Sequence, residues 1–73
     1  MTTKPVQIEV GEWYFKGCFI QAQNHPKLKA YVVFKDTIGQ EVIGDCMTFI
    51  EAKKLCRDNE VKEPYQKLEN FLK

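Results

Sequence analysis

The chain has 73 residues and a mass of 8.6 kDa, enough for one domain and near the smallest size that sustains a single hydrophobic core. Hydrophobic residues make up 44% and charged residues 29% of the chain, which argues against a disordered protein. Eleven basic and ten acidic residues give a net charge of +1, which disfavours strongly basic nucleic-acid proteins and acidic tail proteins. No apolar run is long enough to span a membrane and residues 1–7 lack a signal-peptide core, so we expect a cytoplasmic protein without membrane contact.

The N-terminal third of the chain predicts strand structure. In residues 1–11, apolar residues at positions 6, 8 and 10 alternate with polar ones, so this segment is either a leader or a short edge strand. Residues 12–23 are rich in aromatic and β-branched side chains and predict one long strand. Gly17 lies in the middle of this strand and indicates a bulge or a close approach of another backbone.

A hairpin is predicted in the middle of the chain, with strands over residues 30–36 and 40–46. Its turn begins at Asp36 and places Gly39 in the left-handed region. In this register Lys35 faces Glu41 and the two form a favourable cross-strand pair. The predicted core face is the one that is apolar along its centre, and its residues are Ala30, Val32, Phe34, Val42 and Cys46.

The strongest local pattern is that of a helix over residues 49–58. Thr48 followed three residues later by Glu51 is a capping box, and Asn59 suits a left-handed stop. After a charged connection, Pro64 suits the first turn of a second, short helix. The apolar stripe of that second helix consists of Tyr65, Leu68, Phe71 and Leu72.

These elements predict an α+β domain: a three-stranded antiparallel sheet packed on one helix, with a second short C-terminal helix. A fourth strand at the N-terminal edge is added if the first segment pairs with the sheet. The chain divides into a leader or edge strand (1–11), the sheet and helix domain (12–59), and a connection with the short helix (60–73).

One motif resembles a known kind of DNA-binding domain. The pattern formed by Gly44, Thr48, Glu51 and Ala52 is similar to the junction between third strand and helix in AP2-type and phage-integrase amino-terminal domains. The resemblance covers residues 13–59 in architecture and implies a three-stranded sheet followed by a helix. Members of these families bind DNA with arginines and other side chains on the sheet, whereas the single arginine here, Arg57, falls on the predicted helix.

The residue types that support catalysis are scattered along the sequence. Three cysteines, at positions 18, 46 and 56, form no CxxC pair and are interpreted as buried thiols that behave as small apolar residues. His25 is the single histidine and lies in a loop. No nucleophile–base pair, phosphate-binding loop or metal motif is present, so we expect no enzyme, no cofactor, no metal and no small-molecule substrate.

The second face of the predicted sheet carries more apolar surface than one helix can cover, which favours a protein partner or a homo-oligomer. Alternatively, the second helix folds back over this face. The partner-binding candidates on it are Phe19, Tyr31, Val33 and Ile43, together with Trp13 and Phe15. The alternative function is DNA or RNA binding through lysine-flanked aromatic residues, for which the candidates are Lys16, Tyr31 and Lys35.

Overall fold

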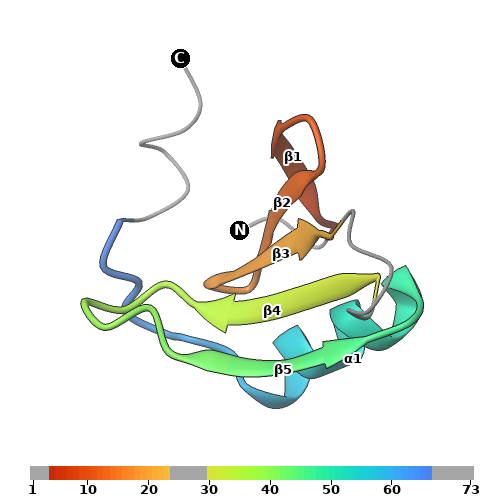
Figure 1. Cartoon of the computed structure of the whole chain (residues 1–73). Helices are drawn as coiled ribbons and strands as arrows, with labels where there is room; N and C mark the ends of the chain where they lie inside the picture. The colour runs from red at the N-terminus through yellow and green to blue at the C-terminus, as the bar shows by residue number, and fades with distance from the viewer. Residues whose placement is uncertain (1–3, 24–29, 67–73) are drawn as a thin grey trace.

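The computed structural model describes residues 4–23 and 30–66 and shows a five-stranded antiparallel sheet with one helix. The strands follow one another across the sheet in chain order, so the sheet is a meander (Figure 1). The elements are β1 (Val6–Glu9), β2 (Glu12–Phe15), β3 (Cys18–Ala22), β4 (Tyr31–Lys35), β5 (Val42–Cys46) and α1 (Phe49–Asp58). The α+β class is confirmed, but the predicted three-stranded sheet with two helices is wrong.

The predicted single strand over residues 12–23 is two strands joined by a tight turn. Lys16 and Gly17 both have positive φ, at 51° and 76°, and Phe15 lies opposite Cys18 in the ladder. Positive φ at both central residues matches the twist of the flanking strands and closes a two-residue hairpin. Gly17 therefore turns the chain instead of forming a bulge. The N-terminal segment forms β1, which pairs with β2 and is the edge strand offered above as one alternative.

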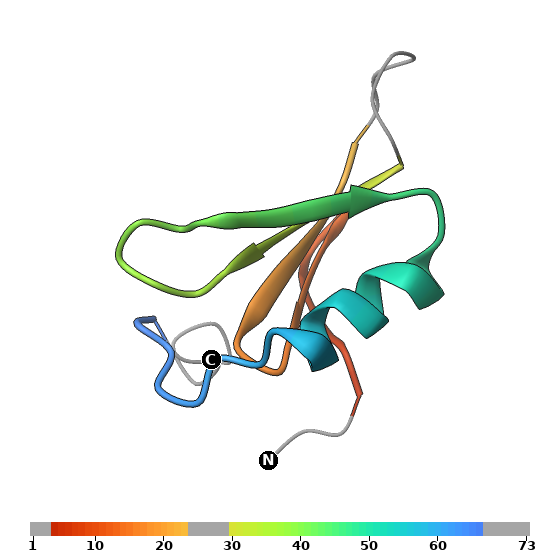
Figure 2. The same cartoon turned by 90° about the horizontal axis from the view of Figure 1, so that it is seen from below.

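Helix α1 has the predicted bounds and covers one face of the sheet, where it packs against β3, β4 and β5 (Figure 2). The Thr48 hydroxyl accepts a hydrogen bond from the Glu51 backbone N–H at 3.2 Å and donates one to the Glu51 carboxylate at 3.0 Å. The helix ends at Asn59 as predicted, but Asn59 has a φ of −125° and is not left-handed. Its backbone N–H and its side-chain amide both donate to the Leu55 carbonyl, which closes the last turn.

The face of the sheet under α1, called here the helix face, holds the core. Its buried side chains are Phe15, Cys18, Ile20, Val33 and Cys46, which meet Ala52 and Cys56 of α1. The core face predicted for strand 30–36 is wrong. The ladder between β4 and β5 pairs Phe34 with Val42, as predicted, but then pairs Val33 with Gly44, so Ile43 is an extra residue in a bulge. This one-residue shift moves Cys46 to the side of Tyr31 and Val33, because side chains alternate between faces.

The opposite side of the sheet, called here the open face, has no helix among the described residues. The strand register gives it Glu12, Tyr14, Phe19, Gln21, Val32, Phe34, Val42 and Asp45. Residues 60–66 contain no helix and run back past the β2–β3 turn toward the end of β4 (Figure 2). The predicted second helix falls largely on residues 67–73, which lie outside the described residues.

Candidate functional site

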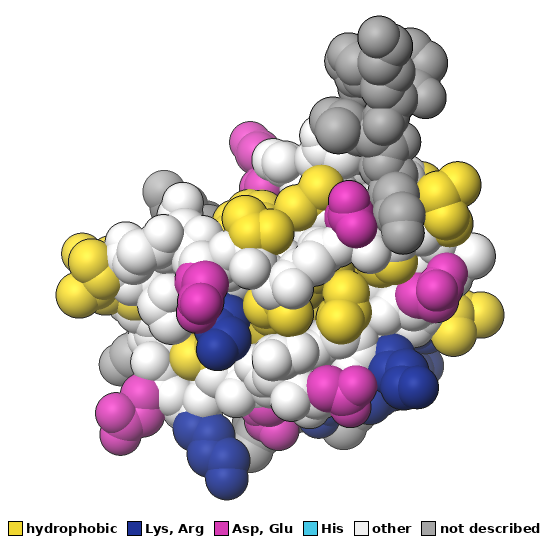
Figure 3. All heavy atoms as spheres, turned by 60° about the horizontal axis from the view of Figure 1, so that its bottom comes forward, with side chains coloured by type: hydrophobic (Ala, Val, Ile, Leu, Met, Phe, Trp, Pro, Cys, Tyr) yellow, Lys and Arg dark blue, Asp and Glu magenta, His cyan; other side chains and the backbone are white. Residues whose placement is uncertain are grey.

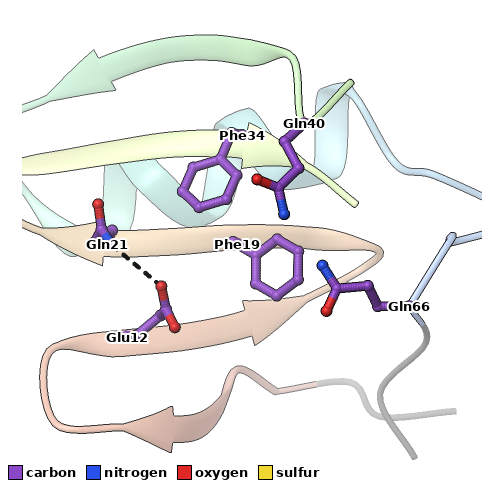
Figure 4. Close-up of a pocket in the computed structure, with 6 residues that line it drawn as sticks. All are labelled: Glu12, Phe19, Gln21, Phe34, Gln40 and Gln66. Carbon is purple, nitrogen blue, oxygen red and sulfur yellow. Dashed lines mark hydrogen bonds between the residues drawn. The ribbon is translucent and has the colours of Figure 1, made fainter. Parts of the chain in front are cut away.

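A hollow of about 310 Å³ lies on the open face of the sheet. Figure 4 shows the side chains that line it, which come from β2, β3, β4, the β4–β5 turn and the C-terminal segment. They are Glu12, Phe19, Gln21, Phe34, Gln40 and Gln66. Ligand pockets for small molecules start at roughly 300 Å³. The hollow lies at the lower end of this range and has room for one side chain of a partner.

The floor of the hollow is aromatic. Phe19 and Phe34 are cross-strand partners whose rings stack with centroids 5.2 Å apart and planes 26° from parallel. Tyr14 packs edge-on against Phe19 with a centroid distance of 5.1 Å, so Phe19 is held from two sides and only 3% exposed. Aromatic pairs of this kind add roughly 0.5–1.5 kcal/mol beyond the area they bury. Phe34 is half-buried and supplies the accessible part of the floor.

Hydrogen-bonding groups line the rim of the hollow. The Gln21 side-chain amide donates to the Glu12 carboxylate at 3.2 Å, and its oxygen accepts from Gln23 Nε2 at 3.1 Å. In Figure 4 the amides of Gln40 and Gln66 both point toward the Phe19 ring. A carboxylate offers acceptors and an amide offers donors and acceptors, so the rim suits a polar group with directional hydrogen bonds.

Gln40 is held in a backbone conformation that costs energy. Its φ is 45°, in the left-handed region, and its N–H donates to the Thr37 carbonyl at 2.9 Å. A side chain with a Cβ pays roughly 1–2 kcal/mol in this region relative to the right-handed one. The sequence predicted this conformation for Gly39, whose φ is not positive in the structure. The strained residue therefore carries one of the side chains that line the hollow.

The end of the hollow is anchored by the buried Asp36. Its carboxylate accepts hydrogen bonds from the Tyr14 hydroxyl at 2.8 Å and the Gln66 backbone N–H at 2.9 Å. Its backbone carbonyl accepts from the Tyr65 N–H at 2.9 Å. Asp36 is fully buried, so these bonds replace the water that its carboxylate would otherwise bind. They position Gln66 beside the aromatic floor.

The sequence-predicted partner residues divide between the two faces of the sheet. Of the six, Phe19 lies on the open face, at the floor of the hollow. The rings of Trp13 and Tyr31 instead pack against Phe49 of α1, with centroids 4.9 and 5.6 Å from it. The other three candidates belong to the core or pack against it, and they are Phe15, Val33 and Ile43. The structure therefore does not bring the six together on one exposed surface.

The nucleic-acid candidates also lie apart. Lys35 forms the predicted pair with Glu41, with Lys35 Nζ 3.7 Å from Glu41 Oε2. Lys16 lies in the β2–β3 turn, with its ammonium 5.5 Å from the centre of the Phe15 ring. Tyr31 belongs to the aromatic cluster under α1. On the side of the molecule in Figure 3, basic and acidic side chains are interspersed around a central group of hydrophobic ones.

All three cysteines are free thiols buried in the core, as predicted. The Cys18 thiol donates to the Asn59 carbonyl at 3.6 Å. A hydrogen bond with Cys18 is the main reason why the pKa of Cys56 is raised, and burial raises it further. The same hydrogen bond lowers the pKa of Cys18, against the effect of its burial. The Cys56 thiol therefore stays neutral inside the core.

We expect iodoacetamide to label the cysteines of the folded chain at least about 100-fold more slowly than those of the urea-unfolded chain. The exposed fractions of Cys18, Cys46 and Cys56 are 0%, 6% and 0%, so labelling requires the core to open. Mass spectrometry should find chains with no label or with three labels. Labelling of Cys46 alone at the rate of the unfolded chain would contradict this expectation.

Sequence reasoning missed the glutamines of the hollow and the role of Asp36. Gln21 and Gln40 are polar residues in or beside strands, and nothing in their spacing distinguishes them from ordinary surface positions. The alternation of residues 31–35 does give a signal for Phe34, because it places the side chains of Phe34 and Val33 on different faces of the sheet. The predicted faces were reversed there, so Phe34 was assigned to the core.

In comparisons with known proteins, no family model matches the chain, and no curated protein or solved structure matches it. The resemblance to AP2-type and phage-integrase amino-terminal domains stays a prediction. No helix among the described residues has both the length and the hydropathy to cross a membrane.

Proposed function

We propose that this protein is a non-catalytic interaction module that binds a segment of a partner protein in the hollow on the open face. The observation that carries the proposal is the strained Gln40, whose amide is placed over an aromatic floor made by Phe19 and Phe34. Positive φ alone does not mark a site, since Lys16 in the β2–β3 turn also has it. At Gln40 the strain coincides with a side chain that lines the hollow, which supports a role in binding.

The chemistry of the lining supports binding over catalysis. The hollow is lined by two rings, three amides and the carboxylate of Glu12. None of these is an activated nucleophile, and Glu12 lacks a second titratable partner in the lining. Apolar floors with a polar rim are the common arrangement of protein interfaces.

Replacing Gln40 with glycine is expected to leave the fold equally stable or more stable by up to about 1 kcal/mol, because the strain at φ 45° disappears. The same change should weaken binding of partner peptides at least about tenfold, because one amide of the rim is lost. Peptides would be selected from a random peptide library displayed on phage, and their affinities measured by fluorescence anisotropy. Urea unfolding gives the stability of each variant.

The matched control is Lys54→Ala, an exposed position on α1 away from the hollow. This control should not change peptide affinity, while Gln66→Ala should weaken it. The proposal fails if no peptide is selected or if the selected peptides bind the Gln40→Gly variant as well as the unchanged chain. It also fails if the Gln40→Gly variant keeps its peptide affinity and forms dimers in sedimentation experiments. Binding of a single-stranded oligonucleotide instead of peptides, with strong salt dependence, would likewise contradict it.

A further inference from the structure

Among residues 4–23 and 30–66, the carboxylate of Glu12 is the one charged group that lines the hollow. Its Oε2 accepts from the Gln21 amide, and no Lys or Arg among residues 4–23 and 30–66 forms an ion pair with it. Glu9 lies opposite Glu12 across the β1–β2 hairpin, which adds a second negative charge at this edge of the sheet. Two like charges on paired strands destabilise the hairpin slightly, and a cation bound between them would remove that cost.

The charged residues at the described strand positions of the open face are all acidic. Its strand positions include two carboxylates, Glu12 and Asp45, and no lysine or arginine. Among the described residues, Lys35 lies opposite Cys18 and therefore on the helix face. An acidic face of this kind attracts a cationic partner and repels nucleic acid, whose phosphates are negative.

Resting on the proposed function, we infer that the group bound in the hollow is the guanidinium of an arginine side chain from the partner. A guanidinium is planar and stacks on a ring face, which Phe34 offers at the floor. Its five N–H donors lie in one plane and match the Glu12 carboxylate, the acceptor-only group of the lining. A lysine ammonium has a compact charge and is more strongly hydrated, so it gains less from stacking on the ring.

The test uses the full chain and three small probes in NMR titrations. The probes are the N-acetyl methylamides of arginine, lysine and citrulline, the last of which keeps the planar end group without its charge. The arginine probe should shift the amide signals of Glu12, Gln21 and Phe34 and bind at least about tenfold more tightly than the citrulline probe. The Glu12→Gln variant should lose this preference, whereas Glu63→Gln, an exposed control of equal charge change, should keep it.

Each outcome separates the ligand assignment from the proposed function. Equal binding of the arginine and citrulline probes, or tighter binding of the lysine probe, overturns the arginine assignment. If phage-selected peptides then still depend on Gln40, the hollow is a binding site for another group and the proposed function stands. Failure of every probe together with failure of every peptide overturns both. A preference for arginine that survives in Glu12→Gln also overturns the assignment, because the charge of Glu12 is its basis.

Discussion

Replacing Gly17 with alanine is expected to destabilise the protein by about 2–5 kcal/mol. Two effects add: the positive φ of 76°, which costs a residue with a Cβ roughly 1–2 kcal/mol, and a steric clash. An ideal Cβ at Gly17 would lie 2.5 Å from the Val61 carbonyl oxygen and 2.7 Å from Val61 Cβ. Overpacking of this kind costs roughly 1–3 kcal/mol. Such a loss approaches the whole stability of a small domain, and urea unfolding measures it.

Gly39→Ala is the matched control, because it makes the same chemical change where neither effect applies. No atom lies within 4 Å of an ideal Cβ at Gly39, and its φ is not positive. The alanine should leave the stability unchanged or raise it by roughly 0.4–1 kcal/mol, because alanine lowers the conformational entropy of the unfolded chain. Equal effects of the two substitutions would show that the approach of Val61 to the β2–β3 turn contributes nothing to stability.

Replacing Asp36 with alanine is the second change with a large expected effect, a loss of about 3 kcal/mol. The carboxylate is fully buried and accepts from the Tyr14 hydroxyl and the Gln66 N–H. Removing the carboxylate deprives both donors of this acceptor, and a buried donor without an acceptor costs roughly 1–3 kcal/mol of stability. Hydrogen exchange should show a second effect, faster exchange at the amides of Tyr65 and Gln66, because Asp36 anchors this segment.

Tyr14→Phe separates the Tyr14 hydrogen bond to the Asp36 carboxylate from that of the Gln66 N–H. It removes one donor, keeps the ring against Phe19, and should cost roughly 1.5–3 kcal/mol, the range for bonds to a charged group. Exchange at Gln66 should change little in this variant, because the bond from its N–H to Asp36 remains. If Tyr14→Phe and Asp36→Ala released the C-terminal segment equally, the anchoring assigned to Asp36 would be wrong.

The helix was predictable because its signals are local. Thr48 and Glu51 are three residues apart and form their contacts within one turn, independent of the rest of the fold. The Lys35–Glu41 pair was predictable for the same reason, since a short hairpin fixes which residues near its turn face each other. Both elements depend on contacts across only a few residues of sequence.

The faces of the sheet were not predictable because they depend on two irregularities. The bulge at Ile43 shifts the register by one residue, and sequence alternation alone does not reveal it. The turn at Lys16 and Gly17 lies inside a run that is rich in strand formers, and lysine is not a typical residue at the first position of such a turn. Each irregularity is set by how the strands pack together.

The hollow depends on contacts between distant parts of the chain. An aspartate at the start of a turn usually lies at the surface, so Asp36 gave no sign that its carboxylate is buried and binds Gln66, thirty residues later in sequence. The predicted site residues followed from the surplus of apolar side chains on one predicted face. In the structure five of the six pack in the core or against α1, and Phe19 alone of them lies in the hollow.

The meander described above also sets the order in which the protein can fold. Each strand pairs with its neighbour in sequence, so every hairpin can form as soon as its second strand leaves the ribosome. The bond from the Val61 N–H to the Lys16 carbonyl and the bonds of residues 65 and 66 to Asp36 come last, since they join late residues to early ones. We therefore expect folding to complete the hollow in its final step, when Gln66 reaches its rim.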